Sequence, residues 1–370
     1  MRKSRAGFEV VGGVLLLVAG VLIAGGVAKP KANASDDAAL NEKIISYVRL
    51  RYGIPDTVKV TATPPQASNF QGFLASTITT TTDDGKEPKT TVIFLTDDRH
   101  YLIVGLLFAL GGDPKAEIVQ HIREQFKIPE PTSVTVGPFH NSGFPNFLAT
   151  TVVADDGKRK QTQDFYITKD NRTLVLGSVF NLGLDLRREA LHAIVTTNHP
   201  TQGPARAPVT IVEYADLQCP SCARLHEFLE KELLPKYGDK VRVIFKEFPL
   251  PMHDWSKTAA IANECVYQIK PEAYAPYRSL IFQNQITINV ANVRDNLLGY
   301  ADQVGVGRVT LAGCLDSKAS LPRIEEGTRE GKRLDIQSTP TCFINGRMLV
   351  GFPSPEAYYK AVDAALEEAK

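Results

Sequence analysis

The sequence of 370 residues has almost no excess of either charge, because 42 lysines and arginines balance 41 aspartates and glutamates to a net charge of +1. No stretch combines clustered basic residues with interleaved aromatic residues. Nucleic-acid binding depends on such a positive surface, so we expect no nucleic-acid partner. Cysteine is scarce as well. Its five residues are an odd number, which leaves at least one thiol unpaired within the chain.

The sequence also lacks a second Cys-X-X-Cys motif beside Cys219-Pro220-Ser221-Cys222. A structural zinc site normally takes four ligands, usually from two such motifs or from one motif and a pair of histidines. We therefore expect no metal site, and no motif indicates a bound cofactor.

Only the N-terminus carries a long apolar run. Three basic residues among the first five precede a 19-residue apolar run over residues 10–28, and Ala32-Asn33-Ala34 fits a signal-peptide cleavage site. A helix needs about 20 apolar residues to cross a bilayer. Residues 1–34 are therefore predicted to be either a cleaved signal peptide or a membrane anchor. Both alternatives place the rest of the chain in the periplasm or on the outer face of the cytoplasmic membrane.

The first half contains an internal repeat of about 72 residues. Ile54-Pro55 recurs as Ile128-Pro129, Gly105 as Gly177, and Phe108 as Phe180. In each copy a helical spacing of apolar residues precedes β-branched runs that are typical of strands. One helix on an antiparallel sheet is the simplest packing of such a copy. We expect two tandem α+β repeats, over residues 36–112 and 113–186, that pair as two lobes.

The second half has a different pattern, predicted to be α/β. Residues 187–207 are predicted to be a linker; residues 185–195 look like a short helix, and residues 196–208 are rich in Pro, Gly and polar residues. From residue 208 to 370 the sequence predicts a strand, a helix and a second strand, with the two strands parallel. Helical segments follow at about 252–335. A hairpin at Asn345-Gly346 and a closing helix complete this domain.

The Cys219-Pro220-Ser221-Cys222 motif lies where the first of these strands gives way to a helix. Two cysteines three residues apart on the first helical turn lie on the same face, so their sulfurs can reach each other. Pro220 suits the first helical position, where its missing N–H would be unpaired anyway. The free N–H groups and the positive end of the helix dipole stabilise a thiolate at Cys219, which is the nucleophile in disulfide exchange. Cys222 would then resolve the mixed disulfide.

Three segments of this half resemble the thioredoxin superfamily, and in particular its DsbA-like branch: VTIVEYADLQCPSC, VIFKEFPL and STPTCFING. The resemblance implies a thioredoxin-like domain with a helical insertion over residues 208–370, acting as a protein disulfide oxidoreductase. It also implies that Thr339-Pro340 is the cis-proline bend that faces the reactive disulfide. There the backbone of Thr339 would bind an extended substrate segment as an added strand.

The same resemblance assigns roles to Glu213 and Lys246, which end the two parallel strands. A buried carboxylate paired with a lysine under the active site can take and return the proton of the resolving thiol. Ser221 departs from the best-known oxidase of the branch, which has histidine at this position. A serine supplies no imidazolium charge, so we expect a less oxidising centre than in that oxidase.

The other three cysteines lie outside the motif. Cys265 and Cys314 fall in the helical region, where they form either a structural disulfide or two buried thiols. Cys342 is interpreted as a small buried strand residue.

The first half has its own resemblance, through IFLTDDRHYLIVGLLFALGG and FYITKDNRTLVLGSVFNLG, to the dimerisation domain of periplasmic disulfide isomerases of the DsbC type. In that family one copy per chain pairs with a copy from a second chain. We expect the tandem copies to pair within this chain, which would make the protein a monomer.

The sequence therefore predicts an extracytoplasmic oxidoreductase that introduces disulfides into folding exported proteins through its CPSC centre. A membrane quinone-linked partner would reoxidise it. A disulfide isomerase or reductase is the alternative. A chaperone-like module that binds unfolded chains is a third reading.

Overall fold

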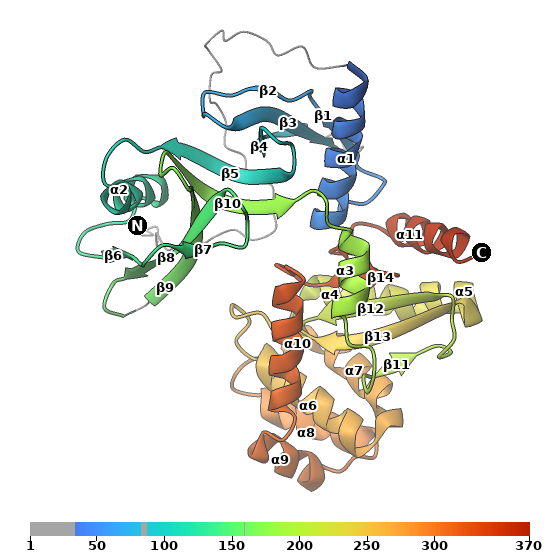
Figure 1. Cartoon of the computed structure of the whole chain (residues 1–370). Coiled ribbons are helices and arrows are strands. Elements are labelled where there is room, and N and C mark those ends of the chain that lie inside the picture. The colour runs from blue at the N-terminus through green and yellow to red at the C-terminus, as the bar shows by residue number, and fades with distance from the viewer. Residues whose placement is uncertain (1–33, 83–86, 159) are drawn as a thin grey trace. The chain divides into compact units, whose positions relative to one another are not determined.

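A computed structural model describes residues 34–82, 87–158 and 160–370 (Figure 1). The predicted leader therefore lies outside the described residues, apart from its last position. None of the described helices is both long enough and apolar enough to cross a membrane. The described chain divides into two compact units. The first holds residues 34–46 and 59–184, and the second holds residues 47–58 and 185–370.

The first unit is built on one antiparallel sheet, which has ten strands among the described residues. The strand order is β1-β3-β4-β5-β10-β9-β8-β6, with β2 paired to β3 and β7 paired to β8. The strands are β1 (Lys59–Ala62), β2 (Gln66–Ala67), β3 (Phe73–Thr81), β4 (Lys89–Thr96), β5 (Tyr101–Ala109), β6 (Ser133–Val136), β7 (His140–Asn141), β8 (Phe147–Asp155), β9 (Lys160–Thr168) and β10 (Thr173–Asn181). Each set of five strands follows a helix, α1 (Ala34–Tyr52) or α2 (Pro114–Phe126).

The two sets of strands join at β5 and β10, which run side by side along their whole length (Figure 1). Gly105 lies opposite Gly177, and a Cβ on Gly105 would stand 2.6 Å from the Gly177 Cα. Side chains at these two positions would therefore force the strands apart. The register is symmetric about the two glycines, since Leu102 faces Phe180 and Phe108 faces Leu174. The sequence predicts two paired lobes, and in the structure they share a continuous sheet.

The second unit is built on a five-stranded sheet of order β11-β13-β12-β14-β15. Its strands are β11 (Thr201–Gln202), β12 (Val209–Ala215), β13 (Val241–Glu247), β14 (Thr341–Ile344) and β15 (Arg347–Val350). β12 and β13 are parallel, as the sequence predicts, and the other pairs are antiparallel. The tight hairpin between β14 and β15 is also confirmed. Asn345 and Gly346 both have positive φ, at 45° and 83°, as its turn requires.

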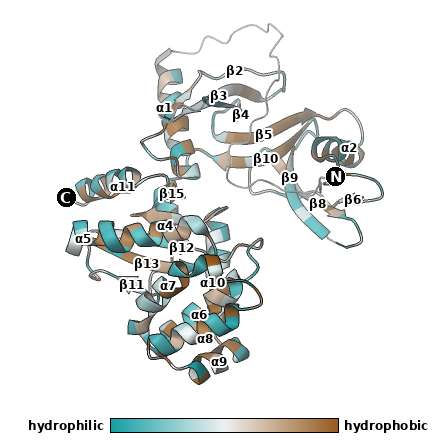
Figure 2. Cartoon of the chain, turned by 180° about the vertical axis from the view of Figure 1, so that it is seen from behind, coloured by the Kyte–Doolittle hydropathy of each residue, from teal (hydrophilic) through white to brown (hydrophobic). Residues whose placement is uncertain are grey.

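Helices cover both faces of this sheet. They are α3 (Leu186–Ala193), α4 (Pro220–Phe228), α5 (Leu234–Tyr237), α6 (Ser256–Ile269), α7 (Tyr274–Gln283), α8 (Val293–Gln303), α9 (Arg308–Ser317), α10 (Leu321–Arg333) and α11 (Pro355–Glu368). α4 and α11 pack with Ile211 and Phe245 on one face, and α3 packs with Tyr214 and Phe343 on the other. α3 and α10 lie in front of the sheet in Figure 1, whereas the reverse view of Figure 2 brings α4 and α5 forward.

Two local features differ from the sequence-based expectations. The short helix expected over residues 185–195 is confirmed as α3, whose Ala190 packs into the apolar cluster with Tyr214. The rest of the stretch predicted as a linker also contains β11, which pairs with β13. The single helix expected after the CPSC motif is interrupted by a π-helical turn, Leu229–Leu233, before α5. Pro235 follows at the start of α5, where its missing N–H breaks the regular hydrogen-bond ladder.

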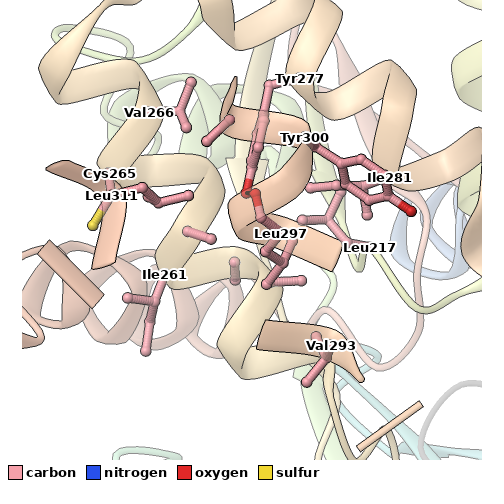
Figure 3. Packing of buried hydrophobic residues seen from close by; sticks show 14 of the residues in the cluster. Leu217, Ile261, Cys265, Val266, Tyr277, Ile281, Val293, Leu297, Tyr300 and Leu311 are labelled. Carbon is pink, nitrogen blue, oxygen red and sulfur yellow. Dashed lines mark hydrogen bonds between the residues drawn. The ribbon is translucent and has the colours of Figure 1, made fainter. Parts of the chain in front are cut away.

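The helical segments α6–α10 lie between β13 and β14, where the sequence predicts an insertion. They enclose their own apolar core, in which Tyr277, Leu297 and Leu311 are fully buried (Figure 3). Leu217, from the loop after β12, belongs to the same core, together with Cys219 and Cys222. The helical insertion therefore forms one wall of the candidate site.

Candidate active site

Cys219 is the residue that precedes the first turn of α4, with Pro220 at the first helical position. Its extended backbone, with φ −80° and ψ 121°, is typical of a helix N-cap. The backbone N–H groups of Cys222 and Ala223 donate to its carbonyl oxygen at 3.0 and 3.2 Å. Cys219 is buried but keeps 8% exposure as a residue, whereas Cys222 is fully buried. The first cysteine can therefore meet a second molecule, and the second faces the protein interior.

Asp216 holds the loop between β12 and α4. Its buried carboxylate accepts hydrogen bonds from the backbone N–H of Gln218 and of Leu250, both at 2.7 Å, and lies 2.8 Å from Nδ1 of His253. The backbone N–H of Asp216 in turn donates to Cys222 Sγ at 3.4 Å. The sequence analysis did not identify Asp216, since an acidic residue before a CXXC motif carries no signal of its own.

Gln285 holds the same loop from the helical insertion. Its side-chain amide donates to the carbonyl oxygens of Leu217 at 2.8 Å and Cys219 at 3.1 Å. Sequence reasoning missed this residue too, because it lies 66 residues beyond the cysteine whose carbonyl it binds.

The Thr339-Pro340 bend lies against Cys219. Its peptide bond is cis, and the Thr339 carbonyl oxygen is 3.4 Å from Cys219 Sγ. The Thr339 hydroxyl is buried and has no hydrogen-bond partner among the described residues. The structure thus brings together the CPSC motif and the Thr-Pro bend, 120 residues apart in sequence.

The two sulfurs differ strongly in acidity. A hydrogen bond from the Cys222 thiol outweighs burial, and the backbone N–H groups of Cys222 and Ser221 add to it. Together they hold the pKa of Cys219 at about 5, well below its ordinary value of 9.0. Burial raises the pKa of Cys222 well above that value. At neutral pH the reduced site therefore holds a thiolate at Cys219 and a thiol at Cys222.

The predicted pairing of Glu213 with Lys246 is wrong. In the parallel register of β12 and β13, Glu213 lies opposite Phe245 and Lys246 lies opposite Tyr214. Successive side chains of a strand point to opposite faces, so the two charged groups lie on opposite sides of the sheet. Lys246 forms a buried ion pair with Glu330, which also accepts a hydrogen bond from the Tyr214 hydroxyl. Lys246 therefore lies outside the candidate site.

Arg278 of α7 is the cation that binds Glu213. Its Nη2 donates to Glu213 Oε2 at 3.0 Å, and both side chains are almost completely buried. Burial raises the pKa of Glu213, and the guanidinium opposes that shift. Arg278 carried no signal in the sequence, because it lies within the helical insertion, 65 residues after its partner.

Glu247 is a second buried carboxyl group on the same face of β13. It lies opposite Ala215, two positions beyond the pairing of Glu213 with Phe245. Its Oε1 accepts a hydrogen bond from the Asn263 amide at 2.7 Å, and its Oε2 has no partner among the described residues. Burial raises its pKa to about 8, so Glu247 is largely protonated at neutral pH.

The remaining three cysteines lie outside the CPSC motif and are either disulfide-bonded or buried. Cys265 and Cys314 form a disulfide between α6 and α9, with their Cα atoms 6.1 Å apart. Cys342 of β14 is fully buried and accepts a hydrogen bond from the Tyr358 hydroxyl at 3.4 Å. Burial raises the pKa of Cys342, which keeps it a thiol. Over the described residues, no group of three or more His, Cys, Asp or Glu side chains is arranged to hold a metal ion.

Comparison with known proteins gives matches to this half of the chain. The thioredoxin family model matches residues 195–364. The disulfide bond formation protein D of Bacillus subtilis is 26% identical over 171 residues, which are 45% of this chain and 77% of that protein. A Na(+)/H(+) antiporter of Salinispora tropica is 31% identical over 170 residues, but the match spans only 25% of the antiporter.

Solved structures of the same kind also match. Oxidised BdbD of Bacillus subtilis has a TM-score of 0.44 at 22% identity, covering 47% of this chain and 95% of that chain. The α-DsbA1 protein of Wolbachia pipientis has a TM-score of 0.43 at 23% identity, covering 49% and 96%. Residues 195–364 therefore match the thioredoxin family, and the similarity to a disulfide bond formation protein supports a DsbA-like thiol–disulfide oxidoreductase.

Proposed function

We propose that this enzyme introduces disulfides into folding proteins outside the cytoplasm, and that Cys219 and Cys222 form the disulfide it exchanges. One observation carries the proposal. A thiolate stabilised at the start of α4 is partly accessible, and a buried thiol lies one turn away as its partner. A static disulfide needs no such difference in acidity between its two sulfurs.

The reaction follows from this arrangement. In the oxidised enzyme, a substrate thiolate attacks Cys219 Sγ, and the bond between the two cysteine sulfurs breaks. Its electron pair moves to Cys222 Sγ, which then takes up a proton. A second thiolate of the substrate attacks the substrate sulfur of the mixed disulfide. The Cys219 thiolate leaves, so the substrate loses two electrons and the enzyme gains them.

The low pKa of Cys219 favours this direction. A thiolate that is stable in the reduced enzyme is a good leaving group, and it stabilises the reduced form over the disulfide. The site reaches a pKa of about 5 with Ser221 between proline and the second cysteine. The stabilisation comes from hydrogen bonds, so it does not require an imidazolium. We still expect a weaker oxidant than a relative with histidine at this position.

We propose that the Thr-Pro bend is the substrate platform. The Thr339 carbonyl lies beside Cys219 Sγ, the sulfur that the substrate attacks, and the Thr339 hydroxyl has no partner among the described residues. An extended substrate segment can satisfy such groups by adding a strand. Pro340 fixes the bend and leaves no backbone N–H of its own to compete.

Glu213 is proposed as the proton acceptor for the resolving thiol. It is fully buried on the sheet face that α4 covers, and its Oε1 has no partner among the described residues. Its negative charge also raises the pKa of Cys222, so the two groups influence each other. A carboxylate with a raised pKa can take a proton and return it.

The location and the partners follow from the chemistry. An apolar run behind basic residues directs export, and the bond between Cys265 and Cys314 suits an oxidising compartment. Each turnover leaves the enzyme reduced. A continuing oxidase therefore needs an electron acceptor, which we propose to be a quinone-linked membrane protein.

We also propose that the first unit is a duplicated DsbC-like dimerisation domain whose copies pair within one chain. Residues that match between the copies face each other across β5 and β10, as Gly105 and Gly177 do. A soluble fragment without the leader should therefore be a monomer by light scattering. A stable dimer would falsify internal pairing as a substitute for dimerisation.

Refolding of ribonuclease separates the candidate functions. The leaderless protein should restore activity to reduced ribonuclease in the presence of an oxidant faster than it restores activity to scrambled ribonuclease. The reverse preference would identify an isomerase. The Cys219→Ser variant should lose the activity in both assays, and full activity in that variant would favour the chaperone-like binding module.

A further inference from the structure

Arg278 occupies an unusual position for a charged side chain. It is 2% exposed, and its guanidinium carbon lies 4.5 Å from the ring centre of Phe245 and 5.0 Å from that of Phe282. Nη1 lies 3.2 Å from Nδ1 of His226, and Nη2 binds Glu213. Two aromatic faces and two polar partners therefore fix the guanidinium in one orientation.

The charges around Arg278 are mostly acidic. Burial opposes the guanidinium charge, but the acidic groups around it, with Glu213 the largest contributor, outweigh burial and raise the pKa of Arg278. His226 adds no positive charge, because burial and Arg278 itself lower its pKa to about 3. Arg278 is thus a permanent cation that packs on Phe282, a ring of the same apolar cluster as Cys222.

We propose that Arg278 is a positioning residue of the redox reaction, supplying the fixed positive charge that lets one negative charge pass between Glu213 and Cys222. This inference rests on the proposed function of the CPSC centre. It concerns only the buried second sulfur, since the stabilisation of Cys219 comes from hydrogen bonds at the start of α4.

The resolving step balances with this cation in place. The Cys222 thiol gives its proton to the Glu213 carboxylate, directly or through a water molecule. The resulting thiolate attacks Cys219 Sγ, and the two enzyme sulfurs form a bond. The sulfur bound to Cys219 leaves with the electron pair of the broken disulfide. Before and during proton transfer Glu213 and Cys222 together carry one negative charge, and Arg278 carries one positive charge. No unpaired charge therefore arises in the interior.

The chain provides a matched control on the other face of the sheet. Lys246 and Glu330 form a second buried ion pair, one residue further along β13 from Phe245. Their strand positions point away from α4 and toward α3 and α10. Loss of Lys246 therefore removes a buried cation without removing one from the face of Cys222.

The test measures the two thiol steps separately in the leaderless protein. Reaction of reduced enzyme with glutathione disulfide reports Cys219, and decay of the Cys219–glutathione mixed disulfide reports Cys222. Arg278→Met and Arg278→Gln should slow the decay roughly tenfold, the rate equivalent of about one pKa unit of lost thiolate stabilisation. The rate of formation of the mixed disulfide should change less than about twofold, because Arg278 does not act on Cys219 directly.

Two further variants keep the test decisive. Arg278→Lys retains the charge and should recover most of the decay rate, and Lys246→Met should leave both steps near those of the unaltered protein. Unchanged decay in folded Arg278→Gln would overturn the inference. Equal slowing of both steps, or equal slowing in Lys246→Met, would also overturn it, since either result indicates general destabilisation. An unreactive Cys219 in the unaltered protein would instead refute the proposed function.

Discussion

The two faces of the five-stranded sheet each bury an ion pair, in different surroundings. On one face Glu213 binds Arg278 beneath α4, the helix that begins at the CPSC motif, and on the other Lys246 binds Glu330. Both pairs are almost completely removed from water. Only the first shares its face with Phe245, Cys342 and α4. Burial alone therefore does not indicate the role of an ion pair, whereas the face of the sheet on which the pair lies does.

The largest effect on stability should come from the face away from the cysteines. Lys246→Met leaves the Glu330 carboxylate buried without its cation, and loss of one partner of a buried pair costs about 3–5 kcal/mol. Urea denaturation followed by circular dichroism measures this loss. The Lys246→Met/Glu330→Gln variant should regain much of it. A single variant as stable as the unaltered protein would remove the structural role assigned to this face.

Removing the disulfide of the helical insertion tests whether this bond stabilises the fold without affecting the candidate site. Removal of Cys265 and Cys314 by double substitution with alanine should lower the free energy of unfolding by about 2–4 kcal/mol, because the bond closes a long loop in the unfolded chain. The acidity of Cys219 should not change, since its hydrogen-bond partners lie elsewhere. A shift in its pH-dependent alkylation would show that the bond also shapes the site.

On the reactive face, Glu213→Gln should act on kinetics more than on folding. The amide can still bind Arg278 but cannot take the proton of Cys222, so decay of the mixed disulfide should slow roughly tenfold. Stopped-flow fluorescence measures this step. Lys246→Gln serves as the matched substitution on the other strand. Resolution at the unaltered rate in Glu213→Gln would remove Glu213 from the mechanism.

Glu247 gives the smallest effect and the clearest dependence on pH. Folding raises its pKa from 4.5 to about 8, so its burial costs nothing below pH 4.5 and costs progressively more as the pH rises to 8. Glu247→Gln should therefore raise the melting temperature at pH 8 more than at pH 5. An equal change at both values would show that Glu247 is ionised throughout.

The sequence predicted the parts of the site that depend on local pattern. A CXXC motif between a strand and a helix fixes the placement of Cys219 and Cys222, and the Asn345-Gly346 turn fixes the hairpin that follows Pro340. The partner of Glu213 could not be predicted in this way. The register of β12 and β13 decides which face Lys246 takes, and tertiary packing of the insertion decides that Arg278 reaches the carboxylate.

In the first unit, too, local pattern predicted some features and tertiary contacts decided others. The repeat predicted a helix before each set of strands, and the structure has α1 and α2 in those places. The joining of the two sets into one sheet could not be read from either copy. It depends on the close approach of β5 and β10 at Gly105 and Gly177, which is a contact between copies.

The most direct test of the account is the rate at which iodoacetamide alkylates Cys219 in the reduced protein, followed by mass spectrometry from pH 3 to pH 10. The hydrogen bonds at the start of α4 predict a midpoint near pH 5, with Cys222 unmodified across the neutral range. A midpoint near the ordinary thiol value of 9.0 would contradict the stabilised thiolate on which the proposed mechanism depends.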